Sequence, residues 1–253
     1  MKNVIVRNVV IGDGIPKICV PIVEKEADDI FKVAKEIMEL PIDIVEWRAD
    51  WYEHVFDREK MLAVLKELRT ILGDTPLLFT FRTAEEGGER EVEISQYGDV
   101  NHWAAESGLV DLIDVEAFRG KEIVELILYD AHQHGVKVVG SNHDFYHTPS
   151  QYEIVKRLRL MQELGVDIPK IAVMPKNKQD VLTLLAATEE MYDQYADRPI
   201  ITMSMSGEGV ISRVCGEEFG SAVTFGSAGK ASAPGQMDVE ELREMLTILH
   251  RNL

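Results

Sequence analysis

The chain has 253 residues, 45% of them hydrophobic, with 44 Asp plus Glu against 27 Lys plus Arg. The formal charge of −17 would repel nucleic-acid phosphates and anionic membrane surfaces, so we expect neither as a partner. No apolar stretch approaches the roughly 20 residues of a membrane span. Two cysteines are too few for a disulfide framework, which favours a reduced, cytoplasmic setting.

Short β-branched runs alternate with longer amphipathic stretches along the chain. The runs predicted to be strands are Ile18–Val23, Ile42–Trp47, Leu77–Arg82, Leu112–Phe118, Val136–Ser141, Lys170–Met174, Ile200–Met205 and Ala222–Phe225. Helical spacing of apolar residues predicts helices that include Ala27–Leu40, Arg58–Leu72, Gln151–Leu164, Lys178–Tyr195 and Val239–Leu249. Strict alternation implies parallel strands joined by right-handed crossovers. Eight such units predict an α/β protein with a (β/α)₈ TIM barrel; a doubly wound open sheet is the alternative.

The segment before the first unit has a different pattern. Residues 4–11 are mostly apolar and are followed by Gly12-Asp13-Gly14, which predicts a short N-terminal β-hairpin closing the bottom of the barrel. The sequence contains no interdomain linker, repeat or low-complexity tract. We therefore expect residues 1–253 to form a single (β/α)₈ barrel domain.

Lys170 is the most conspicuous charged residue, because it opens the apolar run Ile171–Met174 directly after Pro169. Burial disfavours an ammonium group and can lower a lysine pKa far enough to leave a neutral amine. Such an amine can attack a carbonyl carbon to form a Schiff base. Exposed lysines are the rule, however, so a strand-opening lysine with its ammonium in solvent is the alternative.

Other charged residues fall where predicted strands end, which is where barrel enzymes place their sites. Glu46 and Arg48 share one face at the end of the second strand, and Arg82 ends the third. A structural salt bridge between Glu46 and Arg48 is the alternative to a binding role. Arg82 has the same structural alternative.

His143 follows the fifth predicted strand. Imidazole titrates near neutrality and is a natural general acid and base, although a lone histidine can also be structural. Glu86, in the loop after the third strand, could orient the ring, and Asp144 competes for that role.

Two further segments carry candidate residues. Arg213 lies in a short Gly- and Ser-bearing segment after the seventh strand. The loop after the eighth strand is small and contains Gly and Pro, which suits a closing lid with Ser232 and Gln236 as hydrogen-bond donors. An ordinary solvated turn is the alternative for this loop.

Motifs for a metal or a phosphate cofactor fail on spacing. Gly229-Lys230 is followed by Ala231 rather than the Ser or Thr of a phosphate loop. The histidine pair His132 and His134 lacks helical ligand spacing. We therefore expect neither a metal nor a cofactor.

Seven short motifs occur in order, each at a predicted strand end or loop. They are Glu46-Trp47-Arg48, Phe79-Thr80-Phe81-Arg82, Glu86-Gly87-Gly88, Ser141-Asn142-His143-Asp144, Pro169–Pro175, Ile211-Ser212-Arg213 and Ser232–Gln236. Together they resemble the type I 3-dehydroquinate dehydratases, and the likeness runs along the whole chain. The resemblance implies metal-free dehydration of 3-dehydroquinate to 3-dehydroshikimate, in the shikimate pathway, by a homodimer.

The resemblance also assigns roles. Lys170 would form an imine, His143 would act as base and then acid in a syn elimination, and Glu86 would support His143. A protonated imine is a strong electron sink, so a base as modest as imidazole can remove the adjacent proton. Substrate binding would fall to Glu46, Arg48, Arg82, Arg213, Ser232 and Gln236.

Two other functions remain open at this stage. A class I aldolase-like lyase shares the barrel and the lysine imine but breaks a carbon–carbon bond. A catalytically inactive barrel would serve as a binding module or scaffold.

Overall fold

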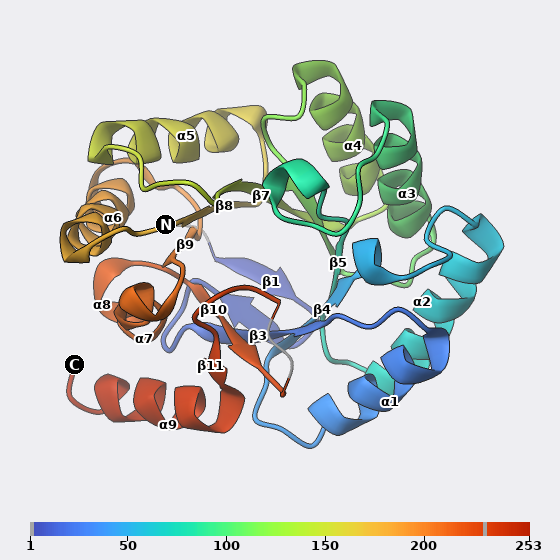
Figure 1. The fold of residues 1–253 in the computed structure, drawn as a ribbon, viewed down its shortest axis with the longest axis horizontal. Helices are drawn as coiled ribbons and strands as arrows, with labels where there is room; N and C mark the ends of the chain where they lie inside the picture. The colour runs from blue at the N-terminus through green and yellow to red at the C-terminus, as the bar shows by residue number, and fades with distance from the viewer. Residues whose placement is uncertain (1–2, 230–231) are drawn as a thin grey trace.

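A computed structural model describes residues 3–229 and 232–253 (Figure 1). A parallel sheet curls around the centre and helices cover its outside. Its order is β11-β10-β3-β4-β5-β6-β7-β8-β9. The strands are β3 (Lys17–Ile22), β4 (Ile44–Arg48), β5 (Leu77–Thr80), β6 (Leu112–Glu116), β7 (Lys137–Asp144), β8 (Ile168–Val173), β9 (Ile201–Ser204), β10 (Val223–Ser227) and β11 (Met237–Asp238). A parallel bridge between Ile200 and Ser221 brings the start of β9 beside that of β10. The predicted α/β, TIM-barrel-like class is thus confirmed.

All eight predicted strands are present, but one boundary changes the position of a candidate residue. The prediction that Lys170 opens its strand is wrong, because β8 begins at Ile168 and Lys170 is its third residue. Pro169 lies near the start of the strand, where its missing N–H removes one ladder hydrogen bond and its fixed φ still suits extended backbone. Lys170 pairs in register with Ser141 on β7 and Ile201 on β9.

The helices follow their strands around the outside of the sheet (Figure 1). They are α1 (Ala27–Ile37), α2 (Arg58–Leu72), α3 (Ile94–Glu106), α4 (Lys121–Gln133), α5 (Gln151–Leu164), α6 (Lys178–Glu190), α7 (Ile211–Val214), α8 (Gly216–Phe219) and α9 (Val239–His250). Helices α2 and α5 have the predicted bounds, and side-chain N-caps, Asp57 and Ser150, begin them. The predicted helix Lys178–Tyr195 ends at Glu190 and continues as the π-helical turn Met191–Tyr195.

The N-terminal segment forms the predicted hairpin. Strands β1 (Val4–Val6) and β2 (Val9–Ile11) pair antiparallel. Arg7 in the turn adopts φ 52°, a left-handed conformation typical of tight hairpin turns.

Alternation along β8 decides which side chains face the inside of the curled sheet. Ile171 and Val173 belong to the large apolar cluster shared with the helices. Ile168 and Ala172 belong to a second, smaller cluster. Because side chains alternate along a strand, Lys170 lies on the inner face with Ile168 and Ala172. Within residues 3–229 and 232–253, no helix is long and apolar enough to cross a membrane.

Candidate active site

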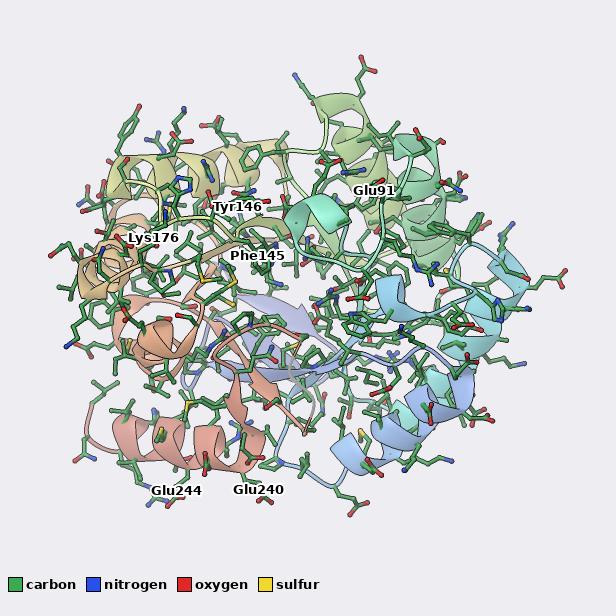
Figure 2. The ribbon with its side chains drawn as sticks, viewed as in Figure 1. Glu91, Phe145, Tyr146, Lys176, Glu240 and Glu244 are labelled. Carbon is green, nitrogen blue, oxygen red and sulfur yellow. The ribbon has the colours of Figure 1, made fainter. Side chains whose placement is uncertain are left out.

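A pocket lies where the strands of the curled sheet end. Eight of the nine predicted site residues line it, Arg213 being the exception. The lining residues are Glu46, Arg48, Arg82, Glu86, Gly87, His143, Phe145, Lys170, Ala172, Met203, Met205, Phe225, Ser232, Ala233 and Gln236. In Figure 2, Phe145 lies toward the centre of the molecule and Tyr146 farther out. The lining residues thus combine charged side chains with apolar ones such as Met203 and Phe225.

The Lys170 side chain is 4% exposed, so the alternative of an ammonium in solvent is wrong. Its Nζ lies 3.3 Å from Asp114 Oδ2 and 4.4 Å from the centroid of the Phe225 ring. The carboxylate and the ring face both favour positive charge at this nitrogen. A lysine that faces a pocket from inside the sheet can reach a bound carbonyl group.

His143 is held by Glu86, which lies in the 3₁₀ turn η2 (Ala84–Glu86) after β5. Glu86 Oε2 lies 2.9 Å from His143 Nδ1 and accepts the His143 backbone N–H at 3.0 Å. Asn142 Nδ2 donates to the other oxygen, Oε1, at 3.1 Å. Asp144, the competing partner, instead accepts backbone N–H groups from Tyr146 and His147. The contact at Nδ1 leaves Nε2 as the ring nitrogen that can reach a bound molecule.

The electrostatics of this pair suit proton transfer. Burial, together with Arg82, Lys170 and Arg48, holds the pKa of His143 well below its usual value, so the imidazole is neutral near pH 7. Burial raises the pKa of Glu86 to about 7, even though Arg82 opposes the shift. A neutral imidazole next to a carboxyl that titrates near neutrality can accept a proton and share it.

Arg48 pairs with Asp50 rather than with Glu46. Its Nε and Nη2 donate to the two Asp50 oxygens at 2.8 and 2.9 Å, with Asp50 in the 3₁₀ turn η1 (Ala49–Trp51). Glu46 Oε1 accepts from Thr80 Oγ1 at 2.8 Å. The ion pairs of the described residues do not include Glu46 with Arg48, so the structural alternative of a salt bridge between them is wrong. Both side chains line the pocket.

Arg82 is enclosed by acidic groups. Its Nη2 lies 2.7 Å from Asp114 Oδ1, and its Nη1 lies 3.3 Å from Glu116 Oε1 and 3.6 Å from Glu86 Oε2. Burial alone would lower the pKa of Arg82, but Asp114, Glu116 and Glu86 raise it above its usual value. Arg82 is thus a fixed positive charge beside the His143–Glu86 pair.

Sequence reasoning missed Asp114 and Glu116. Both lie on β6 and are almost completely inaccessible, at 0% and 2% exposed. Their two-residue spacing inside an apolar strand puts both carboxylates on one face, which is a signal that the sequence contains. Buried carboxylates need partners, and here the partners are Arg82, Lys170 and Thr83.

Arg213, in α7, is a buried cation whose hydrogen bonding is incomplete. It is 1% exposed, and its Nη2 donates to the Pro234 carbonyl at 3.1 Å. Its Nε is buried and has no hydrogen-bond partner in the part of the chain that the structure describes. Among the described residues, no carboxylate lies within salt-bridge distance of its guanidinium, and burial lowers its pKa to about 10. A bound anion would supply the missing counter-ion.

The last loop reaches the pocket through Ser232 and Gln236. Gln236 Nε2 donates to Ser232 Oγ at 3.0 Å, and the Ser232 backbone N–H donates to Gln236 Oε1 at 2.8 Å. Pro234 between them accepts hydrogen bonds from Arg213 and from the Ser206 backbone N–H. Residues 230 and 231 of the predicted lid lie outside the described residues.

The described residues contain no cluster of three or more His, Cys, Asp and Glu side chains placed to hold a metal ion. Cys19 and Cys215 are free thiols. Burial raises the pKa of both, so neither is an activated nucleophile.

The chain was compared with known families, curated proteins and solved structures. The model of the family described as type I 3-dehydroquinase matches residues 18–253. A 3-dehydroquinate dehydratase of Clostridioides difficile is 55% identical over 252 residues, 100% of this chain and 99% of the relative. One from Salmonella typhimurium is 56% identical over 251 residues, 99% of this chain and 100% of the relative.

Solved structures agree with the sequence comparison. A type I 3-dehydroquinate dehydratase from Clostridium difficile, with covalently modified comenic acid, superposes with a TM-score of 0.98 at 55% identity, covering 100% of this chain and 99% of the other. The 3-dehydroquinate dehydratase of Geobacillus kaustophilus gives a TM-score of 0.96 at 37% identity, covering 99% and 97%.

Proposed function

The chain belongs to the type I 3-dehydroquinase family, and we propose that Lys170, His143 and Glu86 perform its reaction. It is a dehydratase that converts 3-dehydroquinate to 3-dehydroshikimate in the shikimate pathway. The observation that carries the assignment of residues is the buried Lys170 amine, which shares one pocket with the His143–Glu86 pair.

The first step joins substrate and enzyme. The Lys170 ammonium first loses a proton, and the resulting amine attacks the ketone carbon of the substrate, forming an N–C bond while the C–O π pair moves to oxygen. Proton transfers and loss of water leave a protonated C=N bond. This iminium withdraws electrons from the adjacent carbon more strongly than the ketone did, which acidifies its C–H bond.

The second step is the elimination. His143 Nε2 removes the proton from the adjacent carbon, and the C–H electron pair becomes the C=C bond of an enamine. The enamine pushes out the β-hydroxyl, which leaves as water with the proton that His143 returns. One residue serves as base and acid, so proton and hydroxyl leave from one face, a syn elimination. Glu86 at Nδ1 supports the cationic intermediate form of the imidazole, and water then hydrolyses the imine.

Substrate binding is assigned to the remaining residues. Arg213 is proposed to clamp the substrate carboxylate, because its buried guanidinium lacks an anionic partner among the described residues and a planar fork binds carboxylates in a bidentate way. Glu46, Arg48 and Arg82 would bind ring hydroxyls. Ser232 and Gln236 would close over the substrate as part of the lid.

We further propose that residues 1–253 form one closed (β/α)₈ barrel domain, with the β1–β2 hairpin closing its N-terminal end. Val4, Val6 and Ile11 of the hairpin share an apolar cluster with side chains near the strand starts, Ile44 and Leu112 among them. The bridge between the starts of β9 and β10 supports closure.

We propose a cytoplasmic homodimer that needs no metal or cofactor and binds neither nucleic acid nor membrane. The charge of −17 supports the last two points, and exposed apolar residues on α4, Leu126 and Tyr129, are candidates for the dimer contact. Sedimentation velocity of the parent and of Tyr129→Glu tests the dimer; a monomeric parent contradicts it.

The reaction is tested by ultraviolet absorbance, because the product is a conjugated enone and the substrate is not. Purified protein with 3-dehydroquinate should give a steady rise, and Lys170→Met should abolish it. A product of carbon–carbon cleavage would indicate the aldolase-like lyase instead. No conversion by folded parent protein would indicate an inactive barrel.

A further inference from the structure

Asp114 is the closest carboxylate to the reactive lysine, and no step above uses it. Its side chain is fully buried on β6. Oδ2 lies 3.3 Å from Lys170 Nζ, while Oδ1 lies 2.7 Å from Arg82 Nη2 and accepts from Ser141 Oγ at 2.6 Å. Both oxygens are therefore fixed, and one of them is aimed at the nitrogen that becomes the imine.

Several charged groups surround the contact between Asp114 and Lys170. The other titratable or charged side chains that face the pair from neighbouring elements are Cys19 on β3, Glu46 and Arg48 on β4, Arg82 after β5, Glu86 in η2 and His143 on β7. Behind Arg82 lie Glu116 and Tyr97. In the described part of the chain, Asp114 is the one carboxylate within 4.0 Å of Lys170 Nζ. The two arginines would otherwise disfavour positive charge at that nitrogen.

We propose that Asp114 is the counter-ion of the protonated imine and keeps its nitrogen protonated until His143 removes the adjacent proton. This inference rests on the imine of the proposed function. Asp114 contacts the reacting nitrogen directly, so it is a catalytic residue rather than a support for one.

The elimination requires a protonated imine nitrogen, because an electron pair moves onto that nitrogen. An imine nitrogen holds a proton more weakly than the amine it came from, so an imine among arginines would lose it. In the elimination, the C–H pair forms the enamine C=C bond and the C=N π pair moves onto nitrogen. An unprotonated imine cannot accept that pair without becoming an anion. Asp114 occupies the position that stabilises the charge, next to where the ammonium stood.

Asp114 can hold this charge because it is itself ionised. Burial alone would raise the pKa of Asp114, but Arg82 and Lys170 lower it below its usual value. The hydrogen bond from Ser141 further supports the carboxylate form. Asp114 also contacts both Lys170 and Arg82, which limits where the long lysine side chain can move.

The test is Asp114→Asn, which keeps the shape and removes the charge, measured as kcat against pH. We expect the alkaline limb of the profile to move down by at least about one pH unit, because an opposite charge at this distance shifts an ionisation by that much. Ser141→Ala is the matched control, since it loosens the same network and leaves the Asp114 charge. The alkaline limb of the Ser141→Ala profile should lie at the same pH as that of the parent, within experimental error. A purely structural role for Asp114 would lower kcat in both variants and shift the alkaline limb in neither.

A second measurement needs no variant and covers the case in which Asp114→Asn does not fold. The parent is mixed with 3-dehydroshikimate carrying ¹³C at the carbonyl carbon, and the imine carbon resonance is followed between about pH 6.5 and pH 9. A position that is constant over this range supports a counter-ion. Titration of the resonance within the range overturns the proposal.

Absence of the imine and absence of a counter-ion role for Asp114 give different experimental results. If borohydride with substrate adds no mass to Lys170 of the parent, the imine itself is wrong. If the adduct forms in the parent and in folded Asp114→Asn, and both enzymes share one pH profile, only the role of Asp114 is wrong.

Discussion

The two ends of the curled sheet use ion pairs in opposite ways. At the strand starts, aspartates precede alternate strands β4, β6 and β8, and each accepts a backbone N–H from the preceding strand and pairs with a cation. The sets are Asp43 with Ile18 N and Arg243, Asp111 with Leu77 N and Arg69, and Asp167 with Val138 N and Lys137. Every one of these carboxylates is satisfied within the chain.

The strand ends differ in that a buried arginine lacks a counter-ion there. Arg48 and Lys170 have buried carboxylate partners, but Arg213 has none among the described residues. Completed pairs at the strand starts join neighbouring strands, and the incomplete one at the strand ends is available to a substrate. The paired charges at the strand starts therefore serve stability, and the unpaired arginine at the strand ends serves binding.

The largest effect at the site end is expected from His143→Ala. Loss of a residue that serves as both base and acid should lower kcat by about 10³-fold or more. Substrate binding and the borohydride adduct should survive, because neither needs the imidazole. His147→Ala, which removes an exposed histidine, is the control and should retain parental kcat. Parental kcat in His143→Ala would contradict the assigned role.

The same substitution, arginine to lysine, should have different effects at the two ends of the sheet. Arg213→Lys keeps a positive charge but loses bidentate recognition, so KM should rise by about 10- to 100-fold, the size expected for charged hydrogen bonds. Arg243→Lys should leave KM unchanged and lower the melting temperature by a few degrees. Steady-state kinetics and thermal unfolding of both variants decide the matter, and the reverse pattern would refute the division between the ends.

A smaller effect is expected on how the free energy of unfolding changes with pH. Burial raises the pKa of Glu86 to about 7, above its ordinary value, so its protonated form is favoured in the folded state. Its contribution to stability is full below about pH 4.5 and is lost as pH rises through about 7. Relative to Glu86→Gln, the parent should therefore lose roughly 2 kcal/mol of unfolding free energy between pH 5 and pH 8.

The lowered pKa of His143 has the opposite sign and adds stability as pH rises through its unfolded value, but it is present in both proteins. Urea unfolding of parent and Glu86→Gln at the two pH values measures the difference. Glu85→Gln is the control, because the Glu85 side chain is 78% exposed. A parent–variant difference that does not change with pH would show that burial of Glu86 carries no such cost.

The fold was predictable because its signals are local. β-Branched runs identified all eight strands, and three- and four-residue spacing of apolar residues identified helices such as α2 and α5. In the structure, the N-caps Asp57 and Ser150 begin these two helices. The strand was predicted to begin at Lys170, directly after Pro169, whereas β8 already pairs with β7 at Ile168 and Pro169.

The candidate residues were predictable as positions, but their partners were not. Which carboxylate an arginine selects depends on packing between elements, so Arg48 pairs with Asp50 instead of Glu46. Asp114 contacts Lys170 across 56 residues of sequence. Motifs indicated where chemistry occurs, and only the folded arrangement shows which charge balances which.

Borohydride trapping shows whether Lys170 forms the imine. Parent protein is incubated with 3-dehydroquinate, reduced with sodium borohydride, digested and mapped by mass spectrometry, with Lys170→Met treated in parallel. We expect one added mass, on Lys170, and none in the variant. An active parent that carries no adduct, or carries it on another lysine such as Lys176, would contradict the claim.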